Sequence, residues 1–254
     1  MIARRCLWIL ASLAVTAALV GLWQHAADAR LVSPAFLPSP ARAWIALIDG
    51  LQQGDLAFKL MSTVERMIYG WLLALLLGIV IGSIIGISRT ARAYLVPTLE
   101  MIRPLPASAI IPVAISFFGL SEGMIIAVIG FGALWPMLLS TVHGFQAVEQ
   151  RLYEVGRLLG LSAWEVIRKI ALPSAMPDIL AGMRIGLTVA LILSVVGEMM
   201  ASADGLGQWV LFAARAFRAA DLYAGVVLLG VIGFLSATIL GAVERYLLRW
   251  RVTP

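Results

Sequence analysis

Residues 67–88 read MIYGWLLALLLGIVIGSIIGIS, a run without a charged residue that lies between Arg66 and Arg89. As a helix rising 1.5 Å per residue, this run crosses a hydrocarbon layer of about 30 Å. Five more runs are apolar enough to do the same. They are 7–26, 104–121 (extending back to about residue 94, with a kink at 104–106), 123–142, 179–200 and 222–243. No segment shows the alternating pattern of a membrane barrel. The sequence therefore predicts an all-α polytopic membrane protein with about six transmembrane helices.

The composition excludes other classes of protein. The chain has 254 residues, of which 61% are hydrophobic and only 13% charged, about half the charge of an ordinary soluble domain. The net charge of +5 is typical of membrane loops rather than of nucleic-acid binding. The single cysteine, Cys6, excludes an internal disulfide and a cysteine zinc site, and the two histidines are far apart. We expect no metal site, no bound cofactor and no catalytic residues, so the chain is not predicted to be an enzyme.

The basic residues predict the orientation in the membrane. If the N-terminus is cytoplasmic, 13 of the 19 Lys and Arg residues fall in cytoplasmic segments. The positive-inside rule then places both termini, and the polar connection 143–178, in the cytoplasm. Residues 1–29 also resemble a signal peptide, with Arg4-Arg5 before the apolar run and Ala27-Asp28-Ala29 after it. We favour a retained first helix because the apolar run exceeds the usual signal core, and cleavage stays the alternative.

The polar connection is predicted to contain two short helices. Leu152, Val155 and Leu158 fall on one helical face, and Gly160 permits the left-handed turn that ends such a helix. Ser162 and Glu165 form a capping box that begins a second helix, which we expect Pro173 to stop beyond residue 172. The apolar residues left over favour a protein partner. A loop that folds back on its own bundle is the alternative.

The same connection resembles a family signature. Glu154-Val155-Gly156, then Gly160, then Ile170-Ala171-Leu172-Pro173 fits the E-A-A-x-x-x-G-x9-I-x-L-P motif of permease subunits of bacterial ABC importers, with Val155 and Gly156 in place of the two alanines. A second set of motifs resembles the nitrate/sulfonate/taurine branch, although Phe117 stands where that branch usually has Trp and Ser140 where it often has Asn. These motifs include Arg103-Pro104-Leu105-Pro106, Phe117-Phe118-Gly119-Leu120, Val196-Gly197-Glu198 and Gly205-Leu206-Gly207.

The resemblance implies the type I importer transmembrane fold in a bacterial inner membrane. Residues 1–60 would form an N-terminal transmembrane helix and a periplasmic segment, 61–245 the transmembrane domain with a cytoplasmic coupling loop at 149–173, and 246–254 a cytoplasmic tail. The resemblance also implies that the loop docks onto a separate ATPase. The chain has no G-x-x-x-x-G-K-[ST] motif for ATP, which agrees with this expectation. The residues implied in docking are Glu154, Gly156, Gly160, Leu161, Ser162, Ala163, Trp164, Ile170, Leu172 and Pro173.

The implied assembly has two permease copies, expected to be identical, two ATPase copies that hold ATP and Mg, and one periplasmic solute-binding protein. The bilayer is the remaining partner, and no nucleic acid is expected. The implied mechanism is alternating access, in which ATP binding draws the two coupling loops together. The implied solute is small and anionic, such as a sulfonate, taurine or nitrate.

Four residues are candidates for the translocation pathway. Glu198 leads, because a carboxylate within an apolar span is costly and usually faces a cavity or a partner; simple solvation at the outer surface is the alternative. Arg215 and Arg218 would attract an anion at the outer mouth, or else dock the binding protein or lie in solvent. Arg103, at a proline-kinked helix entry, would pair with Glu100. The alternative function is a stand-alone secondary transporter or channel, which requires more intramembrane charges or a broken-helix repeat.

Overall fold

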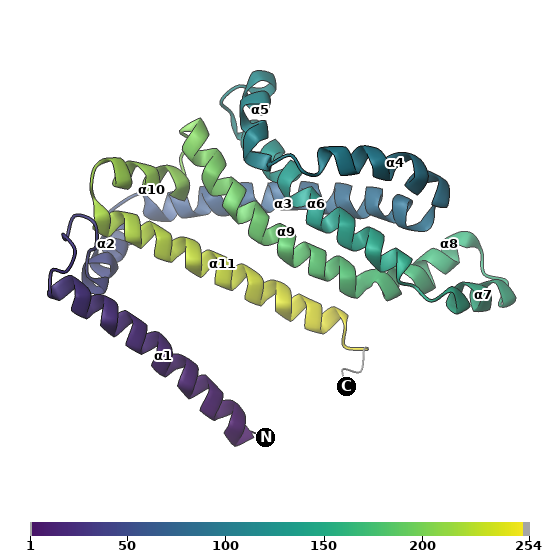
Figure 1. Ribbon diagram of the computed structural model, residues 1–254, viewed down its shortest axis with the longest axis horizontal. Coiled ribbons are helices and arrows are strands. Elements are labelled where there is room, and N and C mark those ends of the chain that lie inside the picture. The colour runs from purple at the N-terminus through teal and green to yellow at the C-terminus, as the bar shows by residue number, and fades with distance from the viewer. Residues whose placement is uncertain (1, 251–254) are drawn as a thin grey trace.

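The computed structural model describes residues 2–250, all of whose regular elements are helical (Figure 1). Residues 251–254 of the predicted tail lie outside the described part. The elements are α1 (Ile2–Asp28), α2 (Pro40–Gln52), α3 (Leu56–Ile87), α4 (Arg89–Ile102), the 3-10 turn η1 (Ala107–Ile110), α5 (Ile111–Phe118), α6 (Glu122–Gln146), α7 (Gln150–Leu158), α8 (Ala163–Val166), the π-helical segment η2 (Ile167–Ala171), α9 (Leu172–Ala201), α10 (Leu206–Arg215) and α11 (Ala219–Leu247).

The centre of the molecule is formed by α3, α6 and α9, which pack along their lengths, with α11 beside α9 (Figure 1). The main apolar core lies between these helices and includes Met67, Ile129 and Met137. The first helix, α1, diverges from this bundle, and it is tied to the rest near its C-terminal end (Figure 1). There the Trp23 indole N–H donates to the Pro38 carbonyl at 2.9 Å. The elements α7 and α8 lie at one end of the bundle, and α2 and α10 lie at the other.

Small residues allow α3 and α6 to approach closely. A Cβ atom built on Gly78, Gly82 or Gly86 of α3 would lie 2.6–2.8 Å from a side-chain Cβ of α6, closer than carbon atoms pack. Lipid tails are as apolar as the helices, so the hydrophobic effect does not bring helices together in a membrane. Close packing of this kind drives their association instead. The four-residue spacing of glycines in α3 therefore serves contact within the subunit.

The all-α prediction is confirmed, and the described residues contain five helices long and apolar enough to cross a membrane, or six if one bent pair counts as a span. The bent pair corrects the predicted run 104–121. Instead of one crossing helix, α4 and the short η1–α5 unit meet at 83°, with the break in the predicted proline segment. Proline lacks an N–H and restricts the residue before it, so Pro104 and Pro106 end the helix rather than only kink it.

A second correction concerns Pro173, which does not stop the helix. The segments α8, η2 and α9 run on as one rod from Ala163 to Ala201, and Pro173 lies in the first turn of α9. The Leu172 N–H bonds to the Ile167 carbonyl, five residues back. This wider π turn accommodates a residue that has no N–H to donate. The rod spans 39 residues, or about 58 Å at 1.5 Å per residue.

Candidate functional site

The turn between α7 and α8 has the predicted left-handed glycine. Gly160 has φ +68°, a conformation that costs an L-residue with a side chain about 1–2 kcal/mol. The Gly160 N–H bonds to the Arg157 carbonyl, and the Leu161 N–H bonds to the Gly156 carbonyl, each at 3.0 Å. This pair of bonds satisfies the last carbonyls of α7 and fixes the direction in which the chain leaves the helix.

The start of α8 is fixed by the predicted capping box. The Ser162 hydroxyl accepts from the Glu165 N–H at 3.3 Å, and the Glu165 carboxylate accepts from the Ser162 N–H at 3.0 Å. Lys169, one turn later, donates to the same carboxylate at 2.8 Å. Each end of the turn is therefore held by local hydrogen bonds. The unit α7–Gly160–α8, called the elbow from here on, has a defined shape.

Gly156 allows the two arms of the elbow to pack together. It is buried, and an added Cβ would lie 3.0 Å from Val166 Cγ2 and 3.2 Å from Ile170 Cδ1. Val155, in contrast, is 48% exposed. The larger of the two residues that replace the alanines thus points outward, where its size costs nothing. Ala171, in the I-x-L-P segment, lies in a small core with Phe145, which joins the elbow to the bundle.

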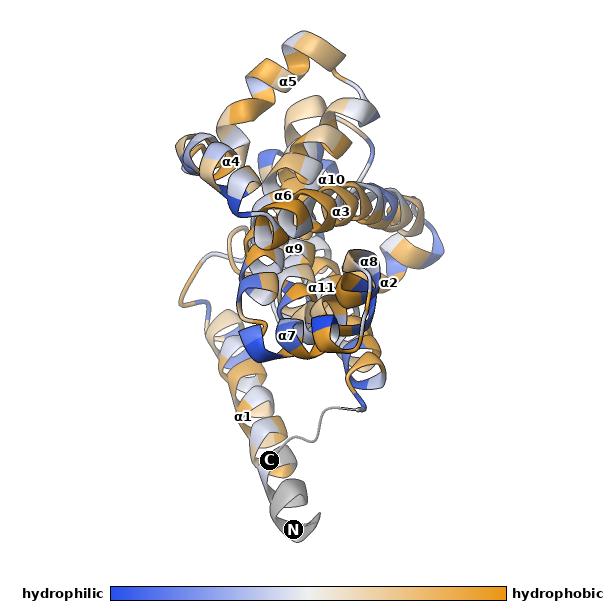
Figure 2. Ribbon diagram, turned by 90° about the vertical axis from the view of Figure 1, so that its right-hand side faces the viewer, coloured by the Kyte–Doolittle hydropathy of each residue, from blue (hydrophilic) through white to orange (hydrophobic). Residues whose placement is uncertain are grey.

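The outer side of the elbow is apolar. Leu158 is 87% exposed, Leu159 70% and Trp164 69%. The rest of α7 carries hydrophilic residues, coloured blue at this end of the molecule in Figure 2. Glu154, Ser162 and Ala163 are also exposed beside them. An apolar patch on an ordered, otherwise polar projection is typical of a protein-binding surface.

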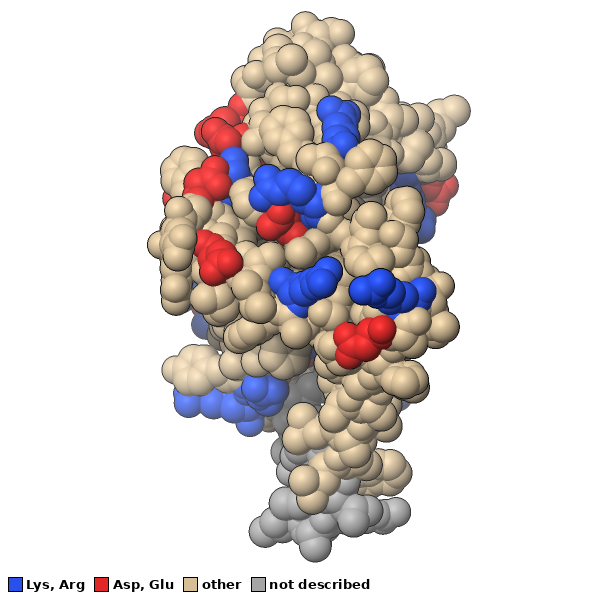
Figure 3. All heavy atoms as spheres, turned by 90° about the vertical axis from the view of Figure 1, so that its left-hand side faces the viewer, with Lys and Arg blue, Asp and Glu red and all other residues tan. Residues whose placement is uncertain are grey.

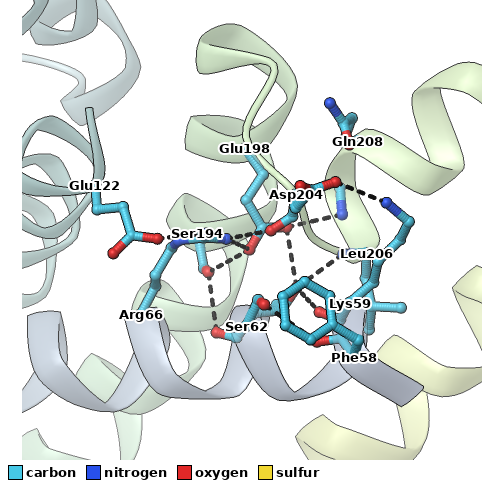
Figure 4. Close-up of polar contacts among 12 residues, drawn as sticks. Phe58, Lys59, Ser62, Arg66, Glu122, Ser194, Glu198, Asp204, Leu206 and Gln208 are labelled. Atoms are coloured by element: carbon cyan, nitrogen blue, oxygen red, sulfur yellow. Dashed lines mark hydrogen bonds and ion pairs between the residues drawn. The ribbon is translucent and has the colours of Figure 1, made fainter. Parts of the chain in front are cut away.

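A second polar site surrounds Glu198, near the end of α9 farthest from the elbow (Figure 4). Its side chain has no exposed surface. One carboxylate oxygen accepts from the Thr63 hydroxyl at 3.0 Å and the Gly207 N–H at 2.9 Å. The other accepts from Arg66 at 3.2 Å and lies 3.5 Å from the Ser194 hydroxyl. A carboxylate is stable at such depth only when paired and hydrogen-bonded in this way.

Arg66 and Lys59 extend this cluster toward the surface. Arg66 bridges Glu198 to Glu122 of α6, and its guanidinium lies 2.9 Å from the Glu122 carboxylate. It also donates to the Asp204 carbonyl at 2.5 Å. Lys59 pairs with the Asp204 carboxylate at 2.9 Å. The hydrogen bond and charge of Lys59 hold the pKa of Asp204 below its usual value. The cluster thus ties the connection between α9 and α10 to the first turns of α3 (Figure 4).

The Gly205-Leu206-Gly207 motif fits tightly against this carboxylate. A Cβ atom on Gly205 would lie 2.2 Å from Glu198 Cδ, and one on Gly207 would lie 2.3 Å from the Val195 carbonyl oxygen. The Leu206 N–H donates to the Thr63 hydroxyl at 2.8 Å. Both glycines are therefore required for α10 to approach α9 and α3 closely.

The four predicted pathway residues are not brought together. Arg103 lines a crevice between α4 and α6, and it forms no ion pair with Glu100, although both lie in the described part of the chain. Arg218 pairs with Asp221 at 2.5 Å, while Arg215 is exposed at the end of α10. The end of the molecule with α2 and α10 carries both acidic and basic side chains (Figure 3), so it is not a purely cationic mouth.

The sequence reasoning missed most partners of Glu198. Lys59, Thr63 and Arg66 belong to α3, which begins at Leu56 rather than after Arg66 as predicted. Their spacing of four and three residues puts them on one helical face, and Ser194 precedes Glu198 by one turn. This helical spacing was the feature of the sequence that could have indicated a shared polar site. No group of three or more His, Cys, Asp or Glu side chains able to hold a metal occurs among residues 2–250.

Comparison with known proteins gives consistent matches. Residues 74–252 match the family described as binding-protein-dependent transport system inner membrane component. The putative aliphatic sulfonates transport permease SsuC of Bacillus subtilis is 33% identical, over 94% of this chain and 87% of that protein. The taurine transport permease TauC of Escherichia coli is 32% identical, over 94% and 89%. The nitrate import permease NrtB of Leptolyngbya laminosa is 26% identical, over 93% and 85%.

Solved structures of ABC transporters have a similar fold. A chain of the MetNI methionine ABC transporter in an inward-facing conformation aligns with a TM-score of 0.67 at 19% identity, over 76% of this chain and 95% of that one. A chain of an amino acid ABC transporter aligns with a TM-score of 0.59 at 18% identity, over 83% and 96%. At these identities the likeness concerns the fold alone.

Proposed function

Because this chain belongs to the family of binding-protein-dependent transport system inner membrane components, in its nitrate/sulfonate/taurine branch, we propose that it forms the solute pathway of an ATP-driven importer. It is a multi-pass protein of the inner membrane. The solute is small and carries an anionic oxygen group, as a sulfonate, taurine or nitrate does, which the names of its relatives suggest. Transport proceeds by alternating access and is energised by ATP hydrolysis on a separate chain.

The observation that carries this proposal is the exposed apolar surface of the elbow. Leu158, Leu159 and Trp164 stand on a turn fixed by local hydrogen bonds, so little ordering entropy opposes the docking of a partner. Burying three large apolar side chains stabilises a complex by about 1.5–3 kcal/mol each before the costs of association. The elbow is therefore the surface on which the ATPase docks.

The continuous rod of α8, η2 and α9 supports transmission from this surface. One end of the rod carries Trp164 of the elbow, and the other carries Glu198. The long segment of α9 packs against α3 and α6 along the bundle. In this proposal a displacement of the elbow is passed on to α9 through the continuous helix from α8. Coupling requires such an element with two arrangements that both sites bias.

The remaining parts of the importer lie on other chains. Two ATPase copies hold ATP and Mg, a second copy of this permease completes the pathway, and a periplasmic binding protein delivers the solute. Both termini and the elbow are cytoplasmic, in accord with the distribution of Lys and Arg. The cluster around Glu198 then lies toward the outer end of the bundle.

Cysteine crosslinking tests the docking of the ATPase. In a Cys6→Ser background, Ala163→Cys on the exposed side of the elbow should form a crosslink to the ATPase in membranes that retain solute uptake. Ser202→Cys, exposed at the opposite end of α9, is the matched control and should give none. Equal crosslinking at both positions, or none at Ala163 in a transporting complex, would contradict the proposal.

A charged residue on the exposed surface of the elbow tests ATPase docking without disturbing the fold. Leu158→Glu should keep the protein in the membrane, because the 87% exposed side chain contributes little to the core. It should lower co-purification of the ATPase and abolish uptake. Normal uptake by this variant would refute the assigned surface.

A further inference from the structure

A hollow of about 510 Å³ lies between the start of α4 and the helix α7 of the elbow. Three arginines line it, one pair from the first turns of α4 and one residue from α7. No Asp or Glu belongs to its lining, whose other polar side chains are amides and a phenol. The residues that matter here are Arg89, Arg92, Arg157, Gln146, Gln150 and Tyr153.

The positive charge of this hollow has no counterpart in the described part of the chain. Arg92 donates to the Gly86 carbonyl at 2.6 Å and the Ile85 carbonyl at 3.3 Å, which orients its guanidinium without neutralising it. Arg89 and Arg157 are exposed, and neither forms an ion pair within residues 2–250. Guanidinium groups bind phosphate oxygens through paired hydrogen bonds. The ligand that fits is thus an anion with several oxygen acceptors.

An apolar crevice adjoins the hollow. It has a volume of about 220 Å³, lies between α4 and α6, and shares Arg92 and Gln146 with the hollow. Its walls are mainly aliphatic, including Leu99 and Leu139. The one carboxylate in the lining, Glu100, lies in the same wall segment as Arg103, so the crevice carries no excess negative charge.

We propose that the hollow and the crevice together bind an anionic phospholipid. The phosphate group contacts Arg89, Arg92 and Arg157, and part of one acyl chain occupies the crevice. The depth is suitable, because the apolar helix α3 ends at Ile87, beside the hollow. Basic pockets between transmembrane helices recognise anionic headgroups in this way. Inorganic phosphate could bind the same arginines, but it has no acyl chain to occupy the crevice. This proposal does not depend on which solute is transported.

Lipid binding by the purified full chain tests the proposal. Native mass spectrometry of detergent-solubilised protein titrated with phosphatidylglycerol should show tighter binding than with phosphatidylcholine. The Arg89→Gln/Arg157→Gln variant should weaken phosphatidylglycerol binding about 30-fold, since each arginine contributes a factor of about five. Arg151→Gln, an exposed arginine of α7 outside the hollow, is the matched control and should bind as the wild type does.

A crevice variant separates lipid from free phosphate. Leu139→Trp, on a residue that is 38% exposed, should fill the crevice and weaken phosphatidylglycerol binding while the arginines remain. Arginine-dependent binding of inorganic phosphate with no preference for phosphatidylglycerol would overturn the proposal. So would unchanged lipid binding in the double arginine variant. Loss of ATPase co-purification in that variant, with lipid binding intact, would assign the arginines to a protein interface and also overturn it.

Discussion

Replacing Glu198 by Gln tests whether the buried polar cluster holds the connection between α9 and α10 against the start of α3. Glutamine has the same shape and keeps one carbonyl oxygen, but its NH2 group then faces donors. Either the Arg66 and Ser194 side or the Thr63 and Gly207 side loses its acceptor. The Arg66 charge also loses its fully buried partner.

The magnitude follows from the surroundings of Arg66. Removing one partner of a buried ion pair costs about 3–5 kcal/mol. Arg66 keeps two other acceptors, the Asp204 carbonyl and the Glu122 carboxylate, whose side chain is 72% exposed. We therefore expect a loss of about 2–3 kcal/mol. For a chain of this size, each kcal/mol lowers Tm by about 2–4 °C, which gives a decrease of about 4–12 °C.

The assay is thermal unfolding of the purified variants in one detergent, together with their abundance in the membrane. Glu122→Gln is the matched control, because it removes the exposed partner of the same arginine and should cost at most about 1 kcal/mol. If Glu198→Gln melts like the wild type, the structural role of the cluster is refuted. Loss of uptake with an unchanged Tm would instead support the role in the translocation pathway that was predicted for Glu198 from the sequence.

Three further predictions concern packing, pH and the elbow. Gly82→Ala, whose Cβ would meet α6 at 2.7 Å, should cost about 1–3 kcal/mol in thermal unfolding, whereas Gly230→Ala, with nothing within 4 Å, should be neutral or stabilising. Lys59 lowers the pKa of Asp204. The stability lost in Asp204→Asn should therefore be constant above about pH 4 and shrink as acid protonates the wild-type carboxylate. A difference in stability between the wild type and this variant that grows in acid would contradict the prediction. Gly160→Ala, at φ +68°, should reduce ATP-dependent uptake more than membrane abundance, and equal losses of both would argue against a coupling role.

The elbow could be predicted from the sequence because its signals are local. The left-handed turn at Gly160 and the capping box of Ser162 and Glu165 depend on residues within a few positions of one another. Their geometry is set before the bundle forms. The end of the second helix was not predicted correctly, because a π turn at η2 accommodates Pro173 without a break. No short sequence motif indicates such a turn.

The cluster around Glu198 could not be assembled from the sequence. The members from α3 are separated by more than 100 positions from those at 194–207, as Arg66 is from Glu198. Charged residues such as Lys59 and Arg66 usually mark the end of a membrane helix, yet here distant carboxylates pair with them and the helix continues. Only the packing of α3 against α9 shows which charges are partners.

The most direct test of the account is solute uptake into proteoliposomes by this chain, with and without its ATPase. We predict that the purified permease alone moves no sulfonate, taurine or nitrate. With the ATPase and the solute-binding protein present, uptake should require ATP and be lost in Leu158→Glu. Uptake by the lone chain without nucleotide would contradict the claim that the elbow receives its driving force from another protein.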